Sequence, residues 1–76
     1  MRNIKYVMIE ECTPVIFTDP ISHKDLKGHG EITSAGFLHF ESGELHVYGE
    51  SLSLKMGPGP RDKELIEAFL ARSYAV

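Results

Sequence analysis

The chain has 76 residues, a length that allows a single domain and buries roughly 60–65% of its unfolded surface. Eight lysines and arginines against eleven aspartates and glutamates give a net charge of −3. That balance argues against a general nucleic-acid binder, which carries a basic field, although a local basic patch stays open. The single cysteine, Cys12, rules out a disulfide framework within the chain and is typical of a reducing compartment.

No apolar run is long enough to span a membrane, and the residues after Met1 do not resemble a signal peptide. We therefore expect a cytoplasmic protein that has neither a membrane nor a nucleic acid as its partner.

Two β-rich segments open the chain, residues 4–9 and residues 14–18, and a polar segment separates them. They predict a first hairpin, with Pro14 at the start of its strand because proline has no N–H for a ladder. Both faces carry apolar side chains, as in a strand that is central, covered twice or part of an interface. Our assignment places Tyr6, Met8, Val15 and Phe17 on one face, and Val7, Ile9 and Ile16 on the other.

A short helical turn is predicted over residues 23–27, after Asp19-Pro20 leaves the sheet. Ser22 is a suitable N-cap with Asp25 three residues later, and Gly28 is a natural residue after the last turn.

Residues 31–41 and 44–50 flank the two-residue loop Ser42-Gly43 and predict a second hairpin whose register is fixed by the loop. The predicted opposite pairs are Glu41–Glu44, Phe40–Leu45, His39–His46, Leu38–Val47 and Phe37–Tyr48. Because side chains alternate, we place Phe40, Leu45, Leu38 and Val47 on the core face. The two histidines then lie on the other face, with Phe37 and Tyr48 beside them.

After Tyr48 the apolar phase changes at Gly49, which predicts a bulge or a bend, and we leave open whether residues 51–55 pair with a different strand. Residues 56–60 form a proline- and glycine-rich linker. A helix follows from Arg61 to about Ser73, with an apolar stripe of Leu65, Ile66, Phe69 and Leu70.

Together these elements predict a single α+β domain over residues 1–76. It consists of a mainly antiparallel sheet of four to five strands from two hairpins, one C-terminal helix packed on one face, and the short helical turn near residues 23–27.

The opposed pair His39 and His46 is the candidate metal site, because opposite residues have Cβ atoms about 4.5–5.5 Å apart, within reach of one ion. Glu41 or Glu44 could add an oxygen ligand, but no zinc motif supports the pair. The ordinary interpretation is a half-exposed cross-strand pair. Cys12 lacks any group that would favour its thiolate, so we interpret it as an inert thiol in a turn. We expect no cofactor, and an enzyme stays open as a third alternative behind the two functions given below.

Four segments, taken together, carry a resemblance over most of the chain. They are Thr13-Pro-Val-Ile-Phe with Asp19 and Ile21-Ser-His, then Ser34-Ala-Gly-Phe, then Tyr48-Gly-Glu-Ser, and finally Pro60 with Asp62 and Glu64-Leu-Ile. In these the sequence resembles small bacterial and phage-associated proteins to which no activity is assigned. The resemblance implies an accessory or phage-associated role and no functional residues.

One helix covers one face of a sheet, so the apolar side chains of the other face need a partner. We therefore expect a non-enzymatic protein-interaction module that self-associates as a homodimer, with a further protein partner left open. The predicted interface residues are Phe37, Tyr48, Tyr6 and Phe17. The alternative is a histidine-based protein that binds a metal or a small ligand.

Overall fold

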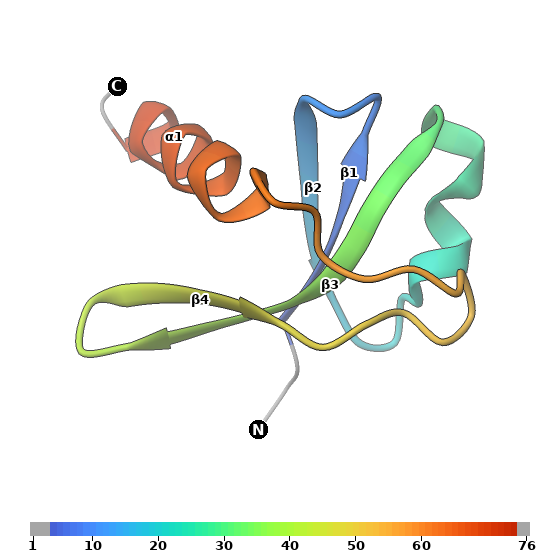
Figure 1. Cartoon of the computed structure of the whole chain (residues 1–76), viewed down its shortest axis with the longest axis horizontal. Helices are drawn as coiled ribbons and strands as arrows, with labels where there is room; N and C mark the ends of the chain where they lie inside the picture. Colours follow the sequence, from blue (N-terminus) through green and yellow to red (C-terminus); the bar gives the residue numbers. More distant parts are fainter. Residues whose placement is uncertain (1–3, 75–76) are drawn as a thin grey trace.

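A computed structural model describes residues 4–74, and the side chains of residues 4–72 (Figure 1). It has a four-stranded antiparallel sheet, a 3-10 helix and a C-terminal α-helix, which confirms the predicted α+β fold. The elements are β1 (Ile4–Ile9), β2 (Thr13–Thr18), η1 (His23–His29), β3 (Ile32–Glu41), β4 (Glu44–Tyr48) and α1 (Asp62–Tyr74), and the sheet order is β2-β1-β3-β4. Across residues 4–74, no helix combines the length and the apolar character needed to cross a bilayer.

The second hairpin, β3–β4, has the predicted register. His39 lies opposite His46, Phe40 opposite Leu45, and Phe37 opposite Tyr48. Ser42 and Gly43 both have positive φ, 54° and 79°. This is the type I′ geometry whose twist matches the flanking strands, so the loop sequence sets the pairing.

Strand β1 lies between β2 and β3 and is paired on both edges, as its two apolar faces suggested. The predicted division of the first hairpin into faces is wrong, however. Tyr6 lies opposite Ile16 and Val7 opposite Val15, because the turn after Ile9 pairs that residue with Thr13. Opposite residues share a face. Val15 and Phe17 therefore lie on the face of Val7, not on that of Tyr6.

Helix α1 covers the face of the sheet that carries Tyr6 and Met8, and it contacts both β2 and β4 (Figure 1). Ile66 is the fully buried member of its apolar stripe, while Leu65 and Leu70 are partly buried against the same cluster. The cluster comprises Tyr6, Met8, Leu38, Leu45 and Ile66.

The opposite face is covered by the chain itself, by η1 and by the segment after β4. Leu26 of η1 packs there, and Leu54 and Met56 are partly buried against the same cluster of Val7, Ile9, Phe17 and Ala35. Residues 51–55 do not form the additional strand that the sequence left open. The chain turns back instead, because Ser51 and Met56 exchange backbone hydrogen bonds. Our premise that this face stays uncovered was therefore wrong for most of the face.

The linker closes the part of the β3 edge that β4 does not reach, because the Ala35 N–H donates to the Gly57 carbonyl at 3.2 Å. Gly36 permits the close approach. A Cβ added there would lie 3.0 Å from the Tyr48 carbonyl oxygen and 3.1 Å from both Pro58 Cγ and Tyr6 Cε1. The absence of a side chain at Gly36 therefore leaves room for the linker to pack closely against β3.

Candidate interaction surface

An apolar pocket of about 530 Å³ lies where β4 ends and the chain turns away from the sheet. We call it the Tyr48 pocket. The residues that line it are His23, Phe37, Tyr48, Gly49, Glu50, Ser51 and Leu52. It joins the end of the second hairpin to η1, so its shape depends on three separate segments of the chain.

Two stacked aromatic rings form one wall of the Tyr48 pocket. Phe37 and Tyr48, opposite each other on β3 and β4, have ring centroids 5.7 Å apart and planes 29° apart. Gly49 makes room for this stack, since it has φ of 71° and an added Cβ would lie 2.8 Å from Phe37 Cδ2. Tyr48 remains 47% exposed and Leu52 82% exposed, so two large apolar side chains at this pocket face solvent.

His23 forms the buried end of the Tyr48 pocket and is 5% exposed. Its Nε2 lies 2.9 Å from the Gly36 carbonyl oxygen. Because a carbonyl oxygen only accepts hydrogen bonds, Nε2 carries the proton and donates it. The ring meets Phe17 and Phe37 edge-on, with centroids 5.4 Å and 5.3 Å apart. His23 thus anchors η1 on β3, a role that the sequence analysis did not predict.

The predicted interface residues separate into two groups. Phe37 and Tyr48 lie together at the Tyr48 pocket. Tyr6 is 0% exposed and lies on the α1 face, and Phe17 is 9% exposed beneath η1. These two side chains belong to the core of the chain and offer no surface to a partner. The prediction included Phe17 because it did not foresee that η1 and residues 51–56 cover its face. It included Tyr6 because it placed Tyr6 and Phe17 on the same face, whereas Tyr6 lies beneath α1.

The histidine pair lies on the outer part of the second hairpin. The rings of His39 and His46 have centroids 6.3 Å apart, and His39 Nε2 lies 3.5 Å from Glu41 Oε1. Their side chains are largely exposed, as expected for a cross-strand pair near a hairpin tip. Within residues 4–74, no group of three or more histidine, cysteine, aspartate or glutamate side chains is placed to hold a metal ion. Metal binding by this pair stays a prediction.

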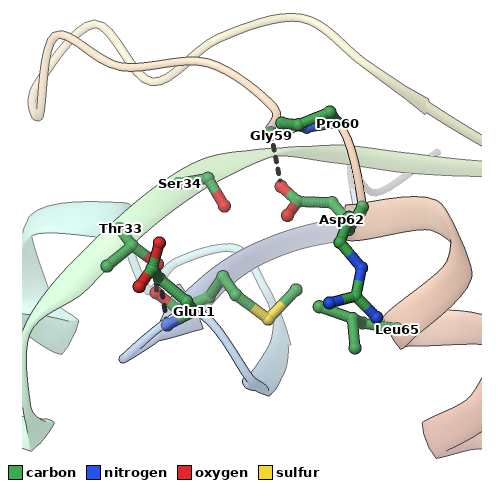
Figure 2. A pocket seen from close by; sticks show the side chains of 9 residues that line it. Glu11, Thr33, Ser34, Gly59, Pro60, Asp62 and Leu65 are labelled. Atoms are coloured by element: carbon green, nitrogen blue, oxygen red, sulfur yellow. Dashed lines mark hydrogen bonds between the residues drawn. The ribbon is translucent and has the colours of Figure 1, made fainter.

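A second, more polar pocket of about 320 Å³ lies at the beginning of α1 (Figure 2). Asp62 is 4% exposed there, and its Oδ2 accepts hydrogen bonds from the Tyr6 hydroxyl at 2.5 Å and the Gly59 N–H at 2.7 Å. Figure 2 shows the Ser34 hydroxyl pointing toward the Asp62 carboxylate, with Glu11 on the far side. The sequence suggested only that Asp62 suits a helix N-terminus. No motif could link it to Tyr6, which is 56 residues away.

The Tyr6 hydroxyl in this polar pocket is held in its neutral form. Burial, and then the hydrogen bond and negative charge of Asp62, raise the pKa of Tyr6 far above its usual value of about 10. Tyr6 therefore donates a proton in a hydrogen bond but does not ionise near neutral pH. The Tyr6–Asp62 contact joins β1 to α1 and supports the fold.

Comparison with known proteins gives no further guidance. No protein family, no curated protein and no solved structure matches the chain significantly.

Proposed function

We propose that the chain is a small protein-interaction module that self-associates through the Tyr48 pocket. The observation that carries the proposal is the half-exposed Tyr48 ring, stacked on Phe37 and adjacent to the 82% exposed Leu52. Aromatic side chains held rigidly at a surface supply much contact area at little cost in conformational entropy, and they are enriched at interfaces. A second copy of the chain is the occupant that we infer.

A phage-associated accessory role in a bacterial host is the wider setting that we propose, on the sequence resemblance alone. A binding module suits such a role because it needs a recognition surface and no catalytic machinery.

Light scattering at several protein concentrations tests the self-association. We expect wild type to be a dimer and Tyr48→Asp to be a monomer, because a carboxylate at the centre of an apolar contact would be desolvated without a partner. Ile21→Asp is the matched control, since Ile21 is 45% exposed and does not line the pocket. Wild type that stays monomeric at high micromolar concentration would refute the proposal.

A histidine-based metal site is the second candidate, favoured by the confirmed opposition of His39 and His46 and by Glu41 beside them. Zinc titration followed by calorimetry of untagged protein tests it. We expect binding to be lost in the double variant His39→Gln and His46→Gln, and wild type that takes up no zinc would exclude this candidate.

A further inference from the structure

The outer edge of β4 is a free strand edge. Within residues 4–74, no backbone hydrogen bond outside the regular ladders and helices involves residues 44–48. The other outer edge belongs to β2, which contains Pro14 and is therefore less able to accept a further strand. Residues 44–48 contain neither proline nor lysine, the residues with which proteins commonly block such an edge.

Like groups face each other on the outer part of the second hairpin. His39 lies opposite His46, and Glu41 lies opposite Glu44. Two carboxylates can only accept hydrogen bonds, so Glu41 and Glu44 are not complementary to each other, whereas each neutral imidazole has one nitrogen that donates and one that accepts. Like charges directly opposite on neighbouring strands are also destabilising.

The contacts that these four side chains do make are long. His39 Nε2 lies 3.5 Å from Glu41 Oε1, and Lys63 Nζ lies 3.6 Å from Glu44 Oε1. All the side chains involved are 47% exposed or more. Exposed ion pairs of this kind contribute about 0–1 kcal/mol and leave the carboxylates able to accept further hydrogen bonds.

We propose that two copies of the chain join edge to edge through antiparallel β4 strands, with Leu45 opposite the partner subunit's Leu45. The inference rests on the proposed self-association and specifies its geometry. In this register Glu44 lies opposite the partner subunit's His46. Four side chains therefore follow one another across the joined sheet, in the order Glu41, Glu44, the partner subunit's His46 and the partner subunit's His39. The two-fold axis generates a second, identical row. Each pair of carboxylates thereby meets a pair of imidazoles, whose N–H groups can donate hydrogen bonds to it.

The backbone permits this register. The two-residue loop makes Glu41 and Glu44 a hydrogen-bonded pair, so by alternation the N–H and C=O groups of Leu45 and Val47 point away from β3. In the proposed register, the backbone N–H and C=O groups of Leu45 can therefore form hydrogen bonds with those of the partner subunit's Leu45.

The same register brings together apolar groups on the α1 face. Phe40, 50% exposed, lies beside Leu45 and so continues an apolar row into the second copy. The register also places Tyr48 opposite the partner subunit's Ser42. The hairpin loop of one copy therefore reaches the Tyr48 pocket of the other copy. In the alternative register, shifted by two residues, His46 lies opposite the partner subunit's His46 and Glu44 lies opposite the partner subunit's Tyr48. The pairing of glutamate with histidine would then be lost.

Disulfide trapping distinguishes the two registers. In a Cys12→Ser background, Glu44→Cys protein is mixed with His46→Cys protein. Opposite residues of a non-hydrogen-bonded pair have Cα atoms about 4.5 Å apart, within the range of about 4.4–6.8 Å that a disulfide needs. We expect a disulfide between the two variants and none within either variant alone. A homodimeric His46→Cys disulfide would overturn the register.

A charge exchange provides an independent test by sedimentation of the dimer. Glu44→Lys places a cation opposite the partner subunit's His46 at two symmetry-related positions, so we expect dimerisation about tenfold weaker or more. The double variant Glu44→Lys with His46→Glu restores opposite charges and should regain most of the affinity. A dimer that is indifferent to both changes, or that forms no β4 disulfide, overturns the edge pairing while self-association stands. A monomeric wild type refutes both proposals.

Discussion

The Tyr6 hydroxyl donates a hydrogen bond to the Asp62 carboxylate and thereby ties the central strand of the sheet to the first turn of α1. No ion pair of the described side chains involves Asp62, although its carboxylate is almost completely buried. Two neutral donors, Tyr6 and the Gly59 N–H, stabilise the carboxylate instead. Buried polar groups are tolerated when they are hydrogen-bonded in this way.

Replacing Tyr6 with phenylalanine should therefore destabilise the fold by about 1.5–3 kcal/mol, the usual contribution of a hydrogen bond to a charged group. Urea denaturation measures the change in the free energy of unfolding. Tyr48→Phe is the control, because the Tyr48 side chain is half exposed and its hydroxyl makes no hydrogen bond with any residue between 4 and 72. Equal stability of Tyr6→Phe and wild type would mean that the contact contributes nothing.

Alkaline pH should weaken the same contact. The pKa of Tyr6 is raised in the folded protein, so the folded state keeps its proton at pH values where the unfolded state loses it. The contribution to stability is complete below pH about 10 and is lost as pH rises above that value. Unfolding measured between pH 8 and pH 11 should therefore show a steeper decline for wild type than for Tyr6→Phe, and parallel curves would contradict the assignment.

Adding one methyl group at Gly36 should destabilise the protein by about 1–3 kcal/mol, the usual cost of overpacking. The new Cβ would meet the Tyr48 carbonyl, the Pro58 ring and the Tyr6 ring, so the linker would have to move away from β3. Gly28→Ala is the matched control, since nothing lies within 4 Å of a Cβ at that position. Thermal unfolding of the two variants should differ clearly, and a Gly36→Ala protein as stable as Gly28→Ala would show that the linker is loosely packed.

Acid should loosen the start of η1. The Asp25 carboxylate accepts hydrogen bonds from the Ser22 N–H at 2.9 Å and from its hydroxyl at 3.2 Å, and these bonds lower the pKa of Asp25. A lowered folded-state pKa means that the stabilisation is present above the unfolded value of about 3.9 and is lost as pH falls through the folded value. NMR titration of the carboxyl carbon should give a midpoint below that of a model peptide. A midpoint at or above the peptide value would exclude the capping contact, and Asp25→Asn should abolish the pH response of the Ser22 amide.

The parts of the fold that the sequence predicts well are those set by local chemistry. The Ser42-Gly43 loop determines its own register, and the spacing of Leu65, Ile66 and Leu70 marks the face that α1 buries. The faces of the first hairpin could not be assigned securely, because β1 is apolar on both sides and alternation alone gives no register.

The part of the candidate site that depends on the local register of the second hairpin was also predictable from the sequence. Phe37 and Tyr48 follow from the hairpin register, and the structure places both at one pocket. Leu52 and His23 come from segments without regular periodicity, so only the folded chain shows that they join this pocket. The Tyr6–Asp62 contact likewise links residues whose pairing depends on how α1 crosses the sheet.

The two apolar clusters lie on opposite sides of one sheet, with Ile66 in one cluster and Leu26 in the other. Layers packed on a sheet are about 10 Å apart, and residues at such separation without shared neighbours contribute independently to stability. The free-energy losses of Ile66→Ala and Leu26→Ala should therefore add in the double variant to within about 0.5 kcal/mol. Each layer could then be redesigned without reference to the other, as long as the strands between them keep their pairing.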